Sequence, residues 1–377
     1  MPLNSASQSD DGQISRSFRY RSLAGLFFAI AALLGVAGSL YVAYAPQIAF
    51  DEATWRKQVL AQDRKLLYAP NYRDGAGFFN PWMPDRPRHG SILQFHASAR
   101  IKNPPDMDES KYAAVPNDYA YLADAGNTLG FAGHASFIIR MDGSTILTDP
   151  YFSGRALIIR DSVTRSVNFS SIPLHPVVLI SHNHYDHLDS WSVSRLVERQ
   201  AVFIVPLGLK GFITSLGATQ VHELDWWQDV TINKIRYTLL PAQHWSRRLW
   251  QSHNSTLWGS FMIEGSSKIF FSGDTGYFIG FKEFGDRFPG IDYALIGVGA
   301  YEPRWFMHYA HLNVEEFFLA ADDLKARVAI PMHFGIIRLG REPLLYPLYE
   351  MDNYVKKHPE WQEKLKVLRV GQYMEIP

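Results

Sequence analysis

The chain has 377 residues, of which 47% are hydrophobic and 20% are charged, so it is long enough and apolar enough to bury one large core. Its 37 lysine and arginine residues balance 37 aspartate and glutamate residues. This zero net charge argues against a nuclease, and no nucleic-acid partner is expected. The absence of cysteine excludes disulfides, thiolate metal ligands and lipid attachment through cysteine, although it assigns no compartment.

An uncharged apolar run follows a short polar tail at the N-terminus. Residues 1–21 are expected to form a disordered cytoplasmic tail, whereas residues 22–45 carry no charged side chain. As a helix, this run would be about 36 Å long, which is enough to cross the hydrocarbon core of a bilayer. Because Arg16, Arg19 and Arg21 precede it, the positive-inside rule places the N-terminus in the cytoplasm and the catalytic part on the periplasmic or luminal side.

A cleaved signal peptide is the alternative for this run. Ala43-Tyr44-Ala45 resembles a cleavage site, but Pro46 would stand directly after the cut, where proline is unfavourable. The run is also long for a signal peptide. A single-pass transmembrane anchor is therefore favoured over a signal peptide, and also over a buried core helix. The proline-rich residues 46–115 are expected to be an irregular linker that wraps the domain after it.

A β-hairpin opens the regular part of the chain. Ser136–Met141 and Ser144–Thr148 are rich in β-branched and apolar residues. Asp142-Gly143 between them is a dipeptide that suits a tight reversal. Asp149 follows the second strand at its end.

The most informative stretch comes next and reads Ile-Ser-His-Asn-His-Tyr-Asp-His over residues 180–187. It follows Pro176–Ile180, a short apolar run typical of a buried strand, so its polar side chains lie on a loop that leaves a strand end. Imidazole and carboxylate are ligands that suit zinc. Four donors within six residues are too many for one ion, so the spacing favours two adjacent metals. The donors are His182, His184, Asp186 and His187.

The rest of the chain alternates apolar runs with helix signals. Asp189 or Ser190 is expected to cap a helix that reaches Arg199, and Asn313 caps an amphipathic helix. The remaining expected elements are strands at Ala201–Val205, Val230–Leu240, Thr256–Ile263 and Asp292–Val298, and a helix at Leu207–Leu216. Periodicity alone gives an α/β or α+β fold.

Three further metal-binding residue types follow apolar runs later in the chain. They are His244 in Pro-Ala-Gln-His-Trp, Asp274 in Ser-Gly-Asp-Thr-Gly, and His333 in Pro-Met-His-Phe-Gly. Together with His-x-His-x-Asp-His, their order and context resemble the metallo-β-lactamase superfamily. The resemblance implies a four-layer αββα sandwich over residues 116–377.

Further blocks narrow the resemblance. Glu223–Trp227, His244–Arg248, Leu257–Ser260, Gly273–Tyr277 and Gly299–Met307 are similar to the N-acylphosphatidylethanolamine-hydrolysing phospholipase D family. The similarity covers roughly residues 127–336. It implies two zinc ions and cleavage of a phosphodiester to phosphatidic acid and N-acylethanolamine. The chain departs from the family at Ser136, where threonine is expected, and it gives no secure match after Leu339.

The resemblance also implies a role for individual residues. His182, His184 and His244 would hold one zinc, Asp186, His187 and His333 the second, and Asp274 would bridge both. Asp186 and His311 are the catalytic candidates, and His311 would orient the phosphate or protonate the leaving alkoxide.

The supporting residues are less sharply defined. Four residues are expected to contact substrate: Tyr185, Trp245, Arg304 and Trp305. The alternative for Arg304 is an ion pair with an acidic residue, and the alternative for the three aromatic side chains is simple packing. Asp149 and His134 are expected to support the ligands from behind, with a plain structural role as the alternative. His308 is expected at the surface.

Three functions follow from these observations. The favoured one is a membrane-anchored dizinc phosphodiesterase that acts on a phospholipid in the bilayer. The alternatives are another hydrolase on the same scaffold, such as a lactonase or a small-molecule phosphodiesterase, and a membrane-anchored binding protein without activity. A homodimer is compatible with the sequence, which does not determine the oligomeric state.

Overall fold

The protein divides into two compact units, Met1–Ile48 with Gly90–Ser98, and Ala49–His89 with Ala99–Pro377. The computed structural model describes residues 26–33, 35–36, 38, 48–84, 90–117, 119–123, 126–163 and 167–377. The second unit holds every predicted site residue.

The first unit contains two helical segments in its described part. Residues 26–33 are helical, and their apolar side chains, including Phe27 and Phe28, are exposed. Helix α3 (Ile92–Ala97) begins at a capping box formed by Ser91 and Gln94. Within the described ranges, no helix combines the length and the apolar character that crossing a bilayer requires. Most of the predicted span 22–45, and the tail before it, lie outside the described residues.

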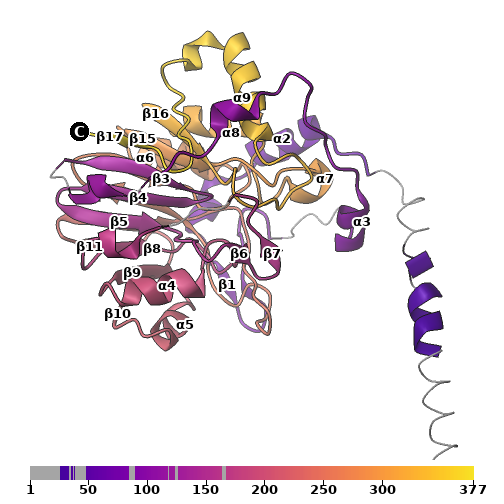
Figure 1. The fold of residues 1–377 in the computed structure, drawn as a ribbon, viewed down its shortest axis with the longest axis horizontal. Helices are drawn as coiled ribbons and strands as arrows, with labels where there is room; N and C mark the ends of the chain where they lie inside the picture. The colour runs from indigo at the N-terminus through magenta and orange to yellow at the C-terminus, as the bar shows by residue number, and fades with distance from the viewer. Residues whose placement is uncertain are drawn as a thin grey trace, which may run out of the picture. The chain divides into compact units, whose positions relative to one another are not determined.

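Two mixed β-sheets form the second unit (Figure 1). The seven-stranded sheet has the order β10 (Gln220–Leu224), β9 (Val202–Pro206), β8 (Val177–Leu179), β5 (Ser144–Thr148), β4 (Ser136–Met141), β3 (Thr128–Gly133) and β17 (Tyr373–Glu375). The six-stranded sheet has the order β11 (Asp229–Ile232), β12 (Ile235–Leu240), β13 (Ser260–Glu264), β14 (Lys268–Phe271), β15 (Tyr293–Gly297) and β16 (Val328–Met332).

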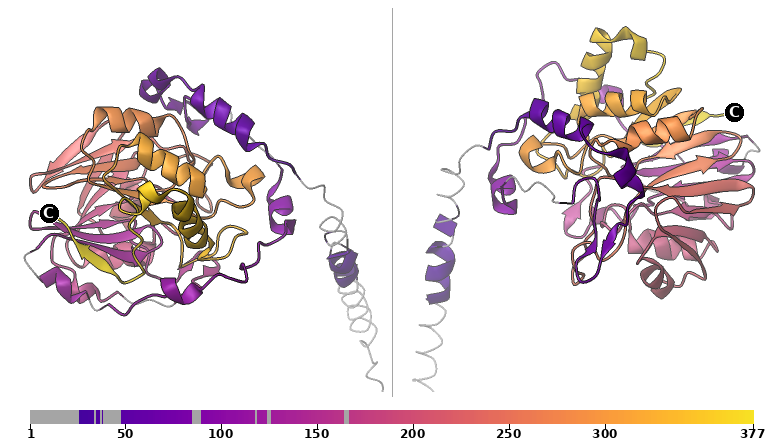
Figure 2. Two further views of the ribbon diagram at one scale, coloured as in Figure 1. Left: turned by 90° about the horizontal axis from the view of Figure 1, so that it is seen from above. Right: turned by 180° about the vertical axis from the view of Figure 1, so that it is seen from behind.

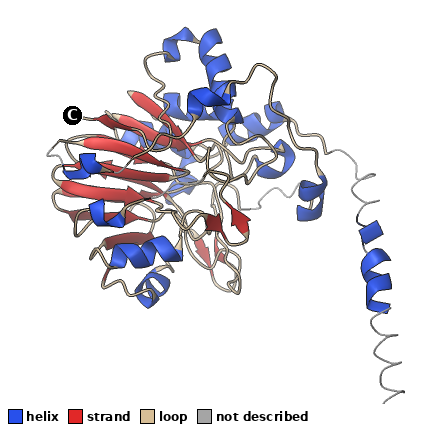
Figure 3. Ribbon diagram, in the orientation of Figure 1, coloured by secondary structure: helices blue, strands red, loops and turns tan. Residues whose placement is uncertain are grey.

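The two sheets pack face to face, and helices cover both outer faces (Figures 2 and 3). Successive side chains along β4 point to opposite faces of the sheet, so one strand contributes to the cores on both faces. Phe137 and Ile139 join the core between the sheets, whereas Ile138 points the other way and packs with Val193 and Leu196 of helix α4. This is the layered α/β arrangement that the sequence predicted.

The helices of the outer layers bury one face each. On the seven-stranded sheet lie α4 (Ser190–Val197) and α5 (Lys210–Ser215), and on the six-stranded sheet lie α6 (Gly280–Arg287) and α8 (Val314–Asp323), with α9 (Tyr346–Lys357) packed on α8. Asn313 starts α8 by accepting a hydrogen bond from the backbone N–H of Glu316, whose side chain accepts one from the backbone of Asn313 in return. This capping box satisfies two of the N–H groups that a helix start leaves free.

Strand direction brings the candidate ligands to one edge. Strands β3, β5, β8 and β9 run the same way in one sheet, and β12, β14, β15 and β16 run the same way in the other. The loops that leave the ends of these strands carry His134, Asp149, residues 182–187, His244, Asp274 and His333. Sheets of this kind place their sites at the carboxyl ends of the strands.

The segment before the sheets is more regular than expected, because it contains helix α2 (Glu52–Leu60), a 3-10 turn η1 (Arg64–Tyr68) and the hairpin β1 (Tyr72–Arg73) and β2 (Gly77–Phe78). It packs along the sandwich through polar contacts. Asn80 donates to the hydroxyl of Tyr309 over 2.7 Å, and Asn71 donates to Asp225 over 2.7 Å. The described part of this segment therefore lies against the domain rather than apart from it.

Most of the local predictions are confirmed. The hairpin has the expected bounds, with Asp142 and Gly143 both at positive φ, and Asp189 caps α4. The single strand expected over Val230–Leu240 is wrong. Asn233 and Lys234 adopt positive φ values of 50° and 69° and fold it into the hairpin β11–β12. Asparagine tolerates this left-handed conformation better than most residues do, and that was the missed signal.

Candidate metal centre

The His-rich loop begins directly after β8, and one buried carboxylate, that of Asp149, forms hydrogen bonds with residues of this loop. Asp149, at the end of β5, accepts hydrogen bonds from the backbone N–H and the hydroxyl of Ser181. Its Oδ2 also lies 2.7 Å from Nδ1 of His187. Three contacts to one buried side chain fix the start of the loop and the orientation of a candidate ligand.

One group of donors joins both sheets. His182 and His184 from the loop meet His244 and Asp274 from the second sheet. Nε2 of His182 lies 2.9 Å from Nδ1 of His184, which lies 3.2 Å from Nε2 of His244. Oδ2 of Asp274 lies 3.9 Å from His182 Nε2 and 3.8 Å from His244 Nε2. These are separations between groups that surround a common point.

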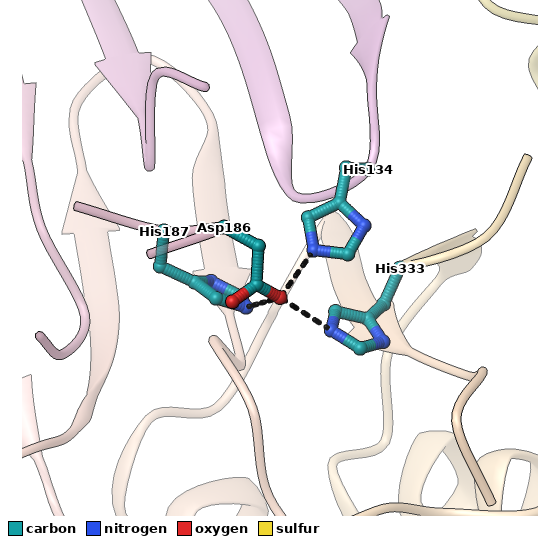
Figure 4. A group of neighbouring side chains, drawn as sticks. All are labelled: His134, Asp186, His187 and His333. Carbon is teal, nitrogen blue, oxygen red and sulfur yellow. Dashed lines mark hydrogen bonds and ion pairs between the residues drawn. The ribbon is translucent and has the colours of Figure 1, made fainter. Parts of the chain in front are cut away.

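A second group lies beside the first and is shown in Figure 4. Oδ2 of Asp186 is 2.9 Å from Nε2 of His134, 3.4 Å from Nε2 of His187 and 3.7 Å from Nε2 of His333. The three rings turn these nitrogens toward the carboxylate in the view drawn. His134 thus stands closer to Asp186 than either histidine predicted as a ligand partner.

Asp274 lies between the two groups. Its Oδ1 is 3.1 Å from Nε2 of His333, and its Oδ2 is 3.2 Å from Nε2 of His187. The same carboxylate therefore faces histidines of both groups. A set of side-chain donors made only of imidazole nitrogens and carboxylate oxygens suits a divalent metal.

Burial and mutual contact set the protonation of these groups. Burial opposes ionisation of Asp186 and Asp274, but the neighbouring imidazoles, His187 foremost, hold the pKa of both carboxyls well below the usual range. Burial also lowers the pKa of His182 and His244 well below the usual range. Both carboxyls are therefore ionised at pH 7, and His182 and His244 are neutral. Burial opposes protonation of His187 and His333, but Asp274 and Asp186 outweigh it and raise the pKa of His187 well above the usual range and that of His333 to about 9. These two imidazoles would release a proton on binding a metal.

His311 lies at the rim of this cluster. Its Nδ1 is 3.9 Å from Oδ2 of Asp274, and its ring stacks on that of His333 with 5.3 Å between centroids. The ring is mostly buried, and burial lowers the pKa of His311 to about 3. The structure thus brings this residue into contact with the candidate ligands.

Two of the four residues expected to contact substrate border the cluster. The ring of Trp245 meets that of His184 at 4.4 Å and stacks on His253 at 5.4 Å. Tyr185 lies under the guanidinium of Arg248 at 3.9 Å from its centroid, and its hydroxyl accepts a hydrogen bond from the backbone of Leu249.

The other two have structural contacts instead. Arg304 is buried and pairs with Glu316 at 2.8 Å and with Glu52 at 2.6 Å, as the acidic-partner alternative expected, while its substrate contact stays a prediction. Trp305 is 8% exposed and packs beside Phe306. The surface position expected for His308 is wrong.

Aromatic packing buries His308. Its ring lies 4.2 Å from that of Phe50 and 4.5 Å from that of Trp55, between centroids. Its Nδ1 lies 2.7 Å from the carbonyl oxygen of Arg304. Helix α2 therefore shields this histidine, which sequence spacing alone did not indicate.

Arg248 supports the donor loop through contacts that the sequence did not reveal. It is buried and donates from Nη1 to the carbonyl oxygens of Asn183 and Leu188, over 2.8 and 2.9 Å. These carbonyls lie at the two ends of the His-rich loop, so one guanidinium spans it. No spacing rule links residue 248 to residues 183 and 188, because the contact arises only when the two sheets meet.

Comparisons with known proteins agree with this geometry. A family model described as beta-lactamase superfamily domain matches residues 144–334. An uncharacterized protein of Mycobacterium tuberculosis is 33% identical over 297 residues, which cover 73% of this chain and 77% of that protein. N-acyl-phosphatidylethanolamine-hydrolyzing phospholipase D 1 of Caenorhabditis elegans is 32% identical over 238 residues, covering 58% of this chain and 67% of that protein.

Solved structures support the fold alone. A possible metal-dependent hydrolase from Veillonella parvula superposes with a TM-score of 0.56 at 14% identity, over 67% of this chain and 100% of that one. The sandwich, the clustered histidines and aspartates, and the matched residues lead to one conclusion. The chain belongs to the metallo-β-lactamase superfamily, as a metal-dependent hydrolase with relatives among N-acylphosphatidylethanolamine-hydrolysing phospholipases D.

Proposed function

We propose that this hydrolase is a dizinc phosphodiesterase that converts N-acylphosphatidylethanolamine-type phospholipids to phosphatidic acid and N-acylethanolamine. The observation that carries the proposal is the pair of donor groups that share Asp274. The relationship to the worm phospholipase D supports the choice of substrate. A lactonase or another phosphodiesterase would use the same donors, so the substrate has to be tested separately.

The proposed ligands follow the two donor groups, except that His134 of the second group is assigned a supporting role. His182, His184 and His244 would hold one ion, Asp186, His187 and His333 the other, and Asp274 would contact both. Bound there, a pair of zinc ions would supply Lewis acidity and would lower the pKa of a bound water toward 7. His134 and Asp149 would act through their contacts to Asp186 and His187 and fix the orientation of those ligands.

The remaining residues would handle the substrate. In hydrolysis, water adds to phosphorus, the bond from phosphorus to the ethanolamine oxygen breaks, and the leaving oxygen takes up a proton. His311 stands beside Asp274, where its neutral imidazole is positioned to contact the phosphate; to pass on that proton it would have to be protonated in the substrate complex. Trp245 and Tyr185, at the border of the cluster, would line the path of the lipid.

The membrane anchor is part of the proposal. Residues 22–45 carry no charge, and their described portion at 26–33 is helical with exposed apolar side chains. An anchor of this kind would keep the enzyme beside a substrate that lies in the bilayer, with the catalytic domain on the periplasmic or luminal side. A C-terminal reporter that works only in the cytoplasm should then be silent, and an active reporter would reject this orientation.

The test of the reaction uses the full chain in detergent with a panel of phospholipids and a lactone. Mass spectrometry should detect phosphatidic acid and N-acylethanolamine from the N-acylated lipid. Asp274→Ala should abolish this turnover, whereas Asp229→Ala, which changes an exposed residue at the far edge of its sheet, should leave it intact. Turnover of the lactone alone would assign the second hydrolase function instead.

A further inference from the structure

Three short segments expose large apolar side chains to solvent. Trp250 is 100% exposed and Leu249 56% exposed, in the loop that follows His244. Ile158 is 84% exposed at the tip of a hairpin formed by β6 (Arg155–Ala156) and β7 (Ile159–Arg160). We name the segments 72–73, 155–160 and 247–250 the apolar rim. Contact between large apolar side chains and water is unfavourable, so several of them on neighbouring loops suggest a surface that binds a partner or a membrane.

The first two links of the apolar rim to the donor loops come from Leu249 and Ser162. The backbone of Leu249 donates to the hydroxyl of Tyr185, which precedes Asp186. The residue after Asp161, Ser162, donates to the carbonyl oxygen of Ile336, three residues after His333. Leu249 thus ties the rim segment 247–250 to the loop that carries Asp186. Ser162, two residues beyond the rim segment 155–160, ties the chain that follows this segment to the loop that carries His333.

The β1–β2 hairpin completes the rim. Phe78 in β2 donates from its backbone to Asn254, in the same loop as Trp250, over 2.9 Å. Tyr72 in β1 is 51% exposed. Figure 1 shows β1 and the hairpin β6–β7 at the same edge of the sheets, the one at which the strands leading to the donor loops end. The apolar rim therefore lies at the same edge of the sheets as the donor loops.

Charge distinguishes the rim from the rest of the molecule. The whole chain has as many acidic as basic residues, 37 of each. The rim segments carry four exposed arginines, Arg73, Arg155, Arg160 and Arg247, whereas the acidic residues directly beside them are exposed Asp74 and half-buried Asp161, so basic charge is in excess there. Guanidinium groups beside exposed tryptophan and isoleucine are the combination that suits the headgroup level of a bilayer, where rings and chains insert and arginine meets phosphate.

We propose that the apolar rim docks the catalytic domain onto an anionic phospholipid surface, so that the candidate metal centre opens toward the bilayer. The inference rests on the proposed function, since a lipid substrate gives the docking its use. It adds a second membrane contact, independent of the N-terminal run. A second copy of the chain is the competing occupant, but it would have to match a surface with an excess of arginine by an acidic patch of its own.

The test exploits the absence of cysteine from the chain. Ile158→Cys and Leu249→Cys, each labelled with an environment-sensitive fluorophore, are reconstituted as full chains into vesicles of phosphatidylcholine with phosphatidylglycerol. Both labels should shift to the blue and be quenched by nitroxide lipids. Lys234→Cys in the β11–β12 turn, at the opposite ends of the strands, is the matched control and should not respond.

Charge and activity give two further readouts. Replacing Arg155 or Arg160 by glutamine should weaken the lipid-induced shift about fivefold for each arginine. The double variant Ile158→Asp/Trp250→Asp should turn over vesicle-embedded substrate at least about tenfold more slowly, with metal content and turnover of detergent-dispersed substrate unchanged.

Labels that stay water-exposed on anionic vesicles would overturn the docking proposal. A shift that follows protein density rather than lipid composition would also overturn it, in favour of a second copy. Because the labels report without turnover, responsive labels on an inactive protein would reject the proposed reaction and retain the docking surface.

Discussion

At the scale of single residues, the His-x-His-x-Asp-His motif identified most of the candidate metal ligands, but it did not identify the residues that hold these ligands in place. His182, His184 and His187 are close in sequence, and the resemblance to the superfamily pattern, together with strand-end context, added Asp274 and His333. The contacts of Arg248 could not be found in this way, because the carbonyls that it binds belong to the other sheet. The pair Arg304–Glu52 joins residues 252 positions apart, so its structural role likewise required the fold.

The first residue-scale prediction concerns Asp149. Asp149→Asn keeps the shape of the side chain but loses the charge that orients His187 through a 2.7 Å contact. Changes of this kind lower metal affinity about 10–100-fold. Zinc titration with a competing chelator should show this loss, with turnover recovering at saturating zinc. An unchanged affinity would mean that Asp149 only closes a turn.

Glu302 gives a prediction on pH. Burial raises its pKa to about 7, above the ordinary value of 4.5. Between these two values the folded state binds more protons than the unfolded state, so this carboxyl makes the protein less stable as pH rises toward 7. Glu302→Gln removes the penalty and should raise Tm relative to wild type at pH 8 but not at pH 4. An equal shift at both pH values would contradict this assignment.

At the scale of elements, short-range signals predicted well where turn and cap chemistry are local. The hairpin β4–β5 and the caps Asp189 and Asn313 need only neighbouring residues. The helix expected over Leu207–Leu216 is shorter, as α5 begins at Lys210, because Pro206 still belongs to strand β9. The packing of residues 49–84 along the domain depends on distant partners, such as Tyr309 for Asn80. The sequence therefore predicted only that this segment wraps the domain, and not which residues it contacts.

Two glycines test the element-scale account as a pair. Gly143 has a φ of 75° in the β4–β5 turn, whereas Gly211 lies in helix α5 without positive φ, and neither has an atom within 4 Å of an added Cβ. Gly143→Ala should destabilise the protein by about 1 kcal/mol through backbone strain, and Gly211→Ala should stabilise it by about 0.5–1 kcal/mol. Urea unfolding of both variants measures the difference. Equal effects would contradict the turn assignment.

At the scale of the whole molecule, the fold converts two sheets into one site. Each sheet contributes only part of the donor set at its strand ends. The packing of the two sheets brings His244, Asp274 and His333 to the His-rich loop. The sequence predicted this convergence through a family resemblance, since periodicity left the fold class open. The apolar rim lies at the same edge, so metal site and proposed lipid contact arise from one arrangement of strands.

The central claim is that two metal ions share Asp274, and metal stoichiometry tests it most directly. The full chain is purified in detergent, saturated with zinc, freed of loose metal by gel filtration, and measured by elemental analysis against amino-acid content. The account predicts about two zinc ions per chain in the wild type and clearly fewer in Asp274→Ala. One ion or none in the wild type, or two in both proteins, would contradict it.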